Sequence, residues 1–451
     1  MAVAKSKGRR ALVLTIGTGD VDRREETLFE PLRKSMKTEK WDKILFLPSQ
    51  MTTDAATQLK DAQPDLPIVV NALSEAGDED NADTCFRRFD EALRCLRQEG
   101  FQPTDIVIDY TRATKAMSAA LVLAGVRHGI PRLRYIIGER DAHGMVKPGS
   151  EIVSEVHTAI VTGRRQLDRG RDLMRQGLFA AVAAILPDPP AESDDSWPSE
   201  LRAEADALAR AATFYAAWDR LDYAGALCSA ESLEDTALEH IKGLLPSAEM
   251  IEWACKLGNA VPASGGPEYC ANMAARVRLL AADLLANGER RIRQGHHEDA
   301  IIRAYRVLEM IGQFRLFDRN LDSGALPATD EWIKKFQDKL VKKGSAPLGS
   351  NRDGTLNAAR QNVARLLLFL GDEFAKNLLC FDRDDPAGSP QLKPNVRNNS
   401  ILIHGFKGVG PDDRKPLDRL FQRLADLLIE AGGRDMKNHI KTARKLDLSN
   451  A

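Results

Sequence analysis

Residues 105–118 read DIVIDYTRATKAMS, an apolar run that passes without a break into hydroxyl and cationic side chains. The run has the length and composition of a buried strand, and Thr114 stands where a helix would take its N-cap residue. A strand that leads straight into a helix is half of a βαβ unit, from which parallel sheets are built. The stretch therefore predicts an α/β domain with a mostly parallel sheet.

The same alternation of apolar runs and helix-period stretches continues on both sides, from Arg10 to about Val156. Strands are predicted at residues 11–16, 43–47, 68–72, 105–109 and 133–138. Amphipathic helices are predicted between them, at residues 24–37, 53–61, 83–98 and 114–128. A hairpin around residues 142–144 and an extended segment at residues 151–156 would close the sheet. The pattern is that of a Rossmann-like domain.

After Thr158 the alternation stops, and the chain reads as helices broken by loops. The most evident loops cover residues 187–199, 342–355 and 382–395. Ala-rich stretches at residues 201–219 and 274–286 have the pattern of core-forming helices. We therefore expect the fold class α/β plus all-α.

Composition limits the class of protein. With 451 residues the chain is long enough for two or three domains, and 43% hydrophobic with 29% charged residues is typical of soluble proteins. We find no apolar run long enough to cross a membrane and no signal peptide, so a cytoplasmic location is expected. The six cysteines form no C-x-x-C pair, which argues against zinc ribbons and disulfide frameworks. The net charge of −1 means that any polyanion site must be local.

A glycine-bearing loop, TIGTGD, follows the first predicted strand at residues 15–20. In open α/β sheets, ligands bind at the carboxyl ends of the strands, and Gly17 and Gly19 would let the backbone approach an anion closely. A full G-x-G-x-x-G is absent, and the second strand ends without an acid for a ribose diol. A conventional dinucleotide site is therefore not expected.

The loop after residue 109 has the composition of a phosphate cradle. A helix N-terminus offers free N–H groups, here beside two hydroxyls and two cations, those of Thr111, Thr114, Arg112 and Lys115. The alternative is that Thr114 is an ordinary N-cap and the two cations are solvated. Two such loops at one sheet edge favour an anionic ligand.

A third motif, PNVRNNSILIHG, covers residues 394–405. On a helix, Arg397 and His404 would lie about 20° apart on one face, with His404 at the C-terminal end, where the helix dipole favours a cation. RNA supplies its own nucleophile, the 2′-hydroxyl, so a His for proton transfer and an Arg for the phosphorane charge suit metal-free cleavage. The alternative is an ordinary helix with an exposed Arg and His, and the pair alone does not decide between these two interpretations.

In this order, the three motifs resemble the type III CRISPR-associated CARF-HEPN ribonucleases. The resemblance rests on residues 16–19, on residues 109–117, and on Arg397 with His404, which fit the family's pattern of Arg, four to six residues, then His. One departure is Arg112-Ala113, where small, often Gly-rich residues are expected. The resemblance implies a CARF sensor domain at residues 1–160, a helical connector at 161–290 and a HEPN ribonuclease domain at 291–451.

The resemblance also implies the function. A homodimer would bind a cyclic oligoadenylate, tetra- or hexa-adenylate, between its CARF domains, and this allosteric activator would switch on metal-independent cleavage of single-stranded RNA by the HEPN dimer. No cofactor, metal, membrane or stable DNA partner is expected. The implied catalytic residues are Arg397, Asn398 and His404. The implied ligand-binding residues are Gly17, Thr18, Gly19, Ser49, Thr111, Arg112, Thr114, Lys115 and Met117.

Residues 295–310 resemble an early helix of the effector domain. His296 and His297 would diverge by about 100° on a helix, so they are expected to start a surface helix rather than to share a metal ion. We expect Arg303, Arg306 and Glu309 to form ion pairs within this helix. The alternative is that they form a rim to the RNA site.

Two other functions remain open. One is a non-enzymatic nucleotide-responsive regulator with a structural helical half, although no basic helix-turn-helix is evident. The other is a CARF domain that also degrades its own activator, using Thr111 or Lys115.

Overall fold

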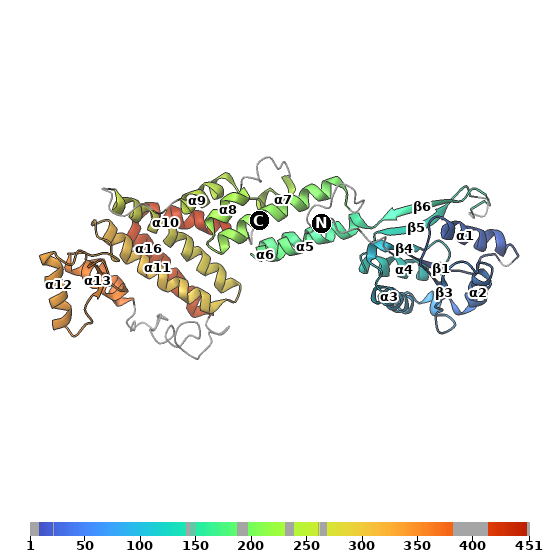
Figure 1. Cartoon of the computed structure of the whole chain (residues 1–451), viewed down its shortest axis with the longest axis horizontal. Coiled ribbons are helices and arrows are strands. Elements are labelled where there is room, and N and C mark those ends of the chain that lie inside the picture. Colours follow the sequence, from blue (N-terminus) through green and yellow to red (C-terminus); the bar gives the residue numbers. More distant parts are fainter. Residues whose placement is uncertain are drawn as a thin grey trace. The chain divides into compact units, whose positions relative to one another are not determined.

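The computed structural model describes residues 9–20, 22–140, 146–147, 149–186, 197–230, 239–259, 261, 268–381 and 414–448 (Figure 1). The chain forms two compact units. The first comprises Met1–Leu167 with Pro189–Ala203, and the second Asp168–Asp188 with Glu204–Ala451. Among the described residues, no helix is long and apolar enough to cross a membrane. The predicted division into three domains stays a prediction.

A six-stranded sheet with the order β3-β2-β1-β4-β5-β6 forms the first unit. All neighbouring strands are parallel except β5 and β6. The strands are β1 (Ala11–Ile16), β2 (Lys43–Pro48), β3 (Ile68–Val70), β4 (Ile106–Asp109), β5 (Arg132–Ile137) and β6 (Ile152–His157). The predicted α/β class is confirmed, although β3 ends earlier than expected. The predicted hairpin around residues 142–144 lies outside the described residues.

Helices cover both faces of this sheet, because alternate residues of each strand point to opposite sides. Val13 packs with α3 and α4, whereas Leu12 and Leu14 pack with α1 and α2. The helices are α1 (Glu30–Lys37), α2 (Thr53–Asp61), α3 (Ala82–Gln98) and α4 (Lys115–Arg127), with the short π-helix η1 (Glu25–Phe29) and the 3₁₀-helices η2 (Gln50–Thr52), η3 (Asp78–Asp80) and η4 (Pro103–Asp105).

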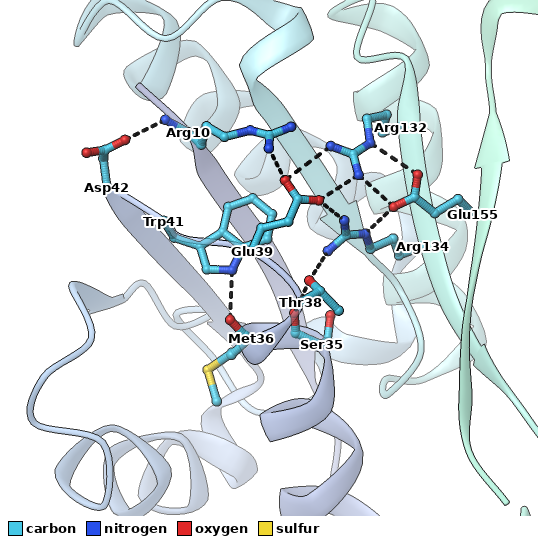
Figure 2. Close-up of polar contacts among 10 residues, drawn as sticks. All are labelled: Arg10, Ser35, Met36, Thr38, Glu39, Trp41, Asp42, Arg132, Arg134 and Glu155. Atoms are coloured by element: carbon cyan, nitrogen blue, oxygen red, sulfur yellow. Dashed lines mark hydrogen bonds and ion pairs between the residues drawn. The ribbon is translucent and has the colours of Figure 1, made fainter. Parts of the chain in front are cut away.

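An ion network joins the end of α1 to the last two strands (Figure 2). Glu39 lies between the guanidinium groups of Arg10, Arg132 and Arg134. Arg132 and Arg134 also contact one oxygen of Glu155 on β6, at 2.8 and 2.7 Å. Burial by itself would raise the pKa of Glu155, but hydrogen bonds and charges from the two arginines hold it at about 2. The network fixes β6 to β5 and both to α1.

The second unit is helical (Figure 1). Its long helices α10 and α11 pack against each other and against α16. Helices α5 and α7 carry the chain across the boundary between the units. The helices from α5 onward are α5 (Ala159–Arg175), α6 (Phe179–Ile185), α7 (Ser199–Asp219), α8 (Tyr223–Ala230), η5 (Glu239–Leu244), α9 (Ala248–Gly258), α10 (Tyr269–Arg293), α11 (His297–Phe317), α12 (Glu331–Lys342), α13 (Arg360–Phe369), α14 (Ala375–Cys380), α16 (Arg414–Ala443) and η7 (Arg444–Leu446), and a small hairpin pairs β7 (Gly349–Ser350) with β8 (Leu356–Asn357).

The start of α11 differs in part from its prediction. His296 is exposed as expected, but His297 is buried, with 7% of its surface accessible. The expectation of a surface position was wrong for His297 because the first turn of α11 packs into the unit. The expected ion pair between Arg306 and Glu309 is confirmed at 3.0 Å. Arg303 pairs with Asp299 at 3.8 Å.

Candidate ligand-binding site

A cleft of about 440 Å³ lies at the carboxyl ends of β1, β2 and β4. The chain fills one side of the sheet from β1 to β3 and then crosses to β4 on the other side, so β1 and β4 flank a topological switch point. Eight of the nine predicted ligand-binding residues line the cleft: Gly17, Thr18, Gly19, Ser49, Thr111, Arg112, Thr114 and Met117. Six further residues line it: Ile16, Met51, Thr52, Glu79, Asp80 and Ala113.

The two glycines of the first loop are required by space and by backbone conformation. A Cβ on Gly17 would lie 3.2 Å from backbone atoms of Ala113, so the two loops touch backbone to backbone. Gly19 has a φ of +65°, and a Cβ there would lie 2.9 Å from the Cβ of Leu28. Gly17 therefore lets the loop after β1 approach the loop after β4, and Gly19 lets the same loop approach η1.

Thr52 ties the loop after β2 to the loop after β1. Its hydroxyl donates to the carbonyl of Ile16 at 2.8 Å and accepts from the amide of Ser49 at 2.9 Å. Ser49 and Thr52 form a capping box at the start of η2. Thr52 was not among the predicted site residues, although the Ser-x-x-Thr spacing is typical of a helix N-cap.

Thr111 uses its hydroxyl to hold the loop after β4. The hydroxyl donates to the carboxylate of Asp109 and accepts from the amide of Ile136 at 3.0 Å. Asp109 is buried, which raises its pKa, and the hydrogen bonds from Thr111 and the charge of Arg134 oppose the rise. The hydroxyl of Thr111 is therefore occupied within the protein, although the residue borders the cleft.

The start of α4 contributes a cap and an exposed cation. Thr114 accepts a hydrogen bond from the amide of Met117 at 3.2 Å and donates to the carbonyl of Glu79. Met117 itself is 1% exposed and belongs to the core between the sheet and α3 and α4. Lys115 is exposed and is not among the residues that line the cleft. The interpretation of Thr114 as the N-cap residue of α4 is thus confirmed.

Arg112 gives the cleft an unsatisfied cation. Its guanidinium makes no ion pair with any described residue, and its buried Nε has no hydrogen-bond partner among them. Burial lowers the pKa of Arg112, and the charges of Glu151 and Asp109 oppose this. An arginine that is half-buried without a partner is a favourable receptor for a phosphate or a carboxylate.

The cleft also contains a hydroxyl, an exposed apolar side chain and two carboxylates. The hydroxyl of Thr18 makes no hydrogen bond to described residues, and Met51 is 73% exposed at the rim. Glu79 and Asp80 line the same cleft and would accept hydrogen bonds from amino or hydroxyl groups. The arrangement suits a ligand that combines a phosphate with donor groups and an apolar surface.

The predicted catalytic residues Arg397, Asn398 and His404 lie outside the described residues. Their helical spacing and shared face therefore stay predictions.

Comparisons with known proteins concern both units. Residues 271–428 match the family described as the Csm6 HEPN domain, and the match begins within α10. The fold resembles that of Enterococcus italicus Csm6 bound to cyclic hexa-2′-fluoro-hexa-dAMP, with a TM-score of 0.54 and 10% identity over 97% of this chain and 100% of that one. A structure of Can2 from Sulfobacillus thermosulfidooxidans with cyclic tetra-adenylate covers 50% of this chain and 69% of its own, at 10% identity. Its TM-score of 0.22 is too low to support a common fold. No curated protein matches the chain in sequence.

Proposed function

We propose that this chain is a type III CRISPR-associated protein of the CARF-HEPN class, in which a cyclic oligoadenylate binds the first unit and activates RNA cleavage by the second. The observation that supports the sensor half most strongly is the unpaired, half-buried Arg112 in a cleft at the switch point of the sheet. The match to the Csm6 HEPN domain supports a nuclease in the second unit.

The cleft offers a partner for each part of such a ligand. A phosphate would be bound by Arg112, by the Thr18 hydroxyl and by the backbone near Gly17 and Gly19. The exocyclic amine of adenine or a ribose hydroxyl would donate to Glu79 or Asp80. Met51 would contact a base face. In a homodimer two copies of this cleft would contact one ring.

For catalysis, we propose that the 2′-hydroxyl of bound RNA attacks the adjacent phosphate. His404 transfers a proton, Arg397 stabilises the phosphorane charge, and Asn398 positions His404 or the phosphate. The products would be a 2′,3′-cyclic phosphate and a 5′-hydroxyl. Every group in this scheme belongs to the RNA or to the three side chains, so the scheme calls for no metal.

The test uses purified protein, a fluorescent single-stranded RNA, EDTA, and either cyclic tetra-adenylate or cyclic hexa-adenylate. We expect one ring to stimulate cleavage and the other to be inactive or much weaker, with products that carry a 2′,3′-cyclic phosphate. Absence of cleavage with both rings, with and without Mg²⁺, would contradict the proposal. Cleavage only with Mg²⁺ would contradict the metal-independent mechanism.

Arg112→Ala is expected to weaken activator binding roughly 10- to 100-fold, because a hydrogen bond to a charged group contributes about 1.5–3 kcal/mol. Cleavage at saturating activator should be unchanged, since the residue lies in the sensor unit. The measurement is the activator concentration that gives half-maximal cleavage, supported by calorimetric titration.

Two lysine variants test whether the effect of Arg112→Ala is specific to the cleft. Lys115→Ala removes a cation from the exposed start of α4, and it should have a smaller effect than Arg112→Ala. Lys60→Ala removes an exposed cation from α2, away from the cleft, and should have none. Equal half-maximal concentrations for wild type and Arg112→Ala would remove Arg112 from the site.

Degradation of the activator by the first unit receives no support from the contacts of Thr111. The hydroxyl is held by Asp109 and by the Ile136 amide, so it is not directed at a ligand. Lys115, the other residue considered for this activity, is exposed and does not line the cleft.

A further inference from the structure

A second concave site lies in the helical unit, between α11, α12, α13 and α14. It is a groove of about 460 Å³. Apolar side chains form its floor: Leu308, Phe336, Leu340, Val363, Ala364, Leu368, Phe369, Leu378 and Leu379. Leu368, Phe369 and Leu379 keep part of their surface exposed, whereas most of the other floor residues are buried. The groove therefore presents an accessible apolar surface.

Four cations line the same groove. Lys339, Lys343, Arg360 and Arg365 line the groove, and Glu309 is the acid among the described lining residues. The charge of Glu309 is already compensated by Arg306 at 3.0 Å. Lys339 and Lys343 are exposed and make no ion pair with described residues.

The sequence of α12 adds to the same charge. Residues 331–343 read EWIKKFQDKLVKK, with five lysines against two acids, in a chain whose net charge is −1. This is the local positive charge that a polyanion would require in a chain without a global field.

An aromatic ring lies beside one of these cations, Lys339. The rings of Phe336 and Phe369 are 5.3 Å apart, and the ammonium of Lys339 lies 5.2 Å from the centre of the Phe369 ring. An accessible ring next to cations that lack counter-charges is the combination with which proteins bind single-stranded nucleic acids, because bases stack on the ring and phosphates contact the cations.

We propose that this groove binds the single-stranded RNA substrate, with a base on Phe369 and the flanking phosphates on Lys339, Lys343 and Arg365. The inference rests on the proposed function for the identity of the polyanion. A polar or acidic peptide would leave the apolar floor unused, and a second copy of this apolar, cationic surface would bring like charges together. A flexible strand that alternates flat bases with phosphates complements both features.

The experiment measures binding rather than cleavage, by fluorescence anisotropy of a labelled 12-nucleotide single-stranded RNA on the full-length protein. Lys339→Ala/Lys343→Ala should weaken binding about ten-fold and reduce the slope of log K against log salt by about 1.4, since each phosphate contact on a single strand contributes about 0.7. Phe369→Leu, which keeps an apolar side chain, should weaken binding about five-fold without changing the salt slope.

The charge-matched control is Lys334→Ala/Lys335→Ala. Both residues are exposed on the same helix and do not line the groove. The proposal is overturned if the two double variants bind RNA equally, if wild type binds no RNA, or if an acidic peptide competes as well as RNA does. Circular dichroism and binding of cyclic oligoadenylate confirm that each variant is folded. If Lys339→Ala/Lys343→Ala binds RNA more weakly than the control and wild type cleaves no RNA, the groove is supported and the nuclease proposal is contradicted. If wild type cleaves RNA and the two double variants bind it equally, the nuclease proposal is supported and the groove is contradicted.

Discussion

His404→Ala is expected to lower activator-stimulated RNA cleavage by about 10²–10⁴-fold, the usual contribution of a general acid or base. The 2′-hydroxyl, the phosphate and the RNA contacts all remain in the variant, but no group is left to protonate the leaving 5′-oxygen. The measurement is the single-turnover cleavage rate at saturating activator. RNA affinity and activator affinity should remain at wild-type values, because the variant removes a step of the reaction and not a binding contact.

A matched control is His296→Ala, which removes an exposed imidazole from the same unit at the N-terminus of α11. It should cleave at the wild-type rate. Mixing wild-type protein with His404→Ala protein gives a second test, because a composite site would use His404 from both protomers. If subunits exchange, an excess of His404→Ala protein should suppress wild-type activity beyond simple dilution. A wild-type rate for His404→Ala itself would show that another residue transfers the proton.

The fold of the first unit could be predicted because each of its elements has a local signal. Strands such as Ala11–Ile16 are buried on both faces and therefore read as continuous apolar runs. The helices between them carry a clear period, as in Ala82–Gln98. The gathering of Gly17, Ser49 and Arg112 at one cleft followed from the rule that parallel strands end at the same edge.

Other features depend on tertiary contacts and have no local signal. Glu79 and Asp80 reach the cleft from a turn before α3, far from the motifs in sequence. His297 is buried although its neighbours are polar, because burial depends on what packs against the helix. The occupied hydroxyl of Thr111 follows from its contacts with Asp109 and Ile136, which only the folded sheet brings together.

Glu39→Ala is expected to destabilise the first unit by about 3 kcal/mol, because it removes the common partner of three arginines. Arg134 is only 2% exposed, so water cannot replace the lost carboxylate, and Glu155 is left to balance both Arg132 and Arg134. In a unit of this size the loss corresponds to a fall in Tm of about 6–12 °C. The measurement is thermal or urea unfolding followed by intrinsic tryptophan fluorescence, to which Trp41 contributes from 5.4 Å beside the Arg134 guanidinium.

The control and the pH dependence separate this network from an ordinary surface ion pair. Glu26→Gln breaks the exposed pair with Arg23 and should change the unfolding free energy by less than about 0.5 kcal/mol. The pKa of Glu155 falls from 4.5 to about 2 in the folded protein. The unfolded chain therefore takes up this proton first as the pH drops, and the stabilisation, complete above pH 4.5, is lost towards pH 2. Adding Glu155→Gln to Glu39→Ala should flatten this decline, because no carboxylate of the network then remains to titrate. Equal stability of Glu39→Ala and wild type at neutral pH would show that water enters the network and solvates the arginines.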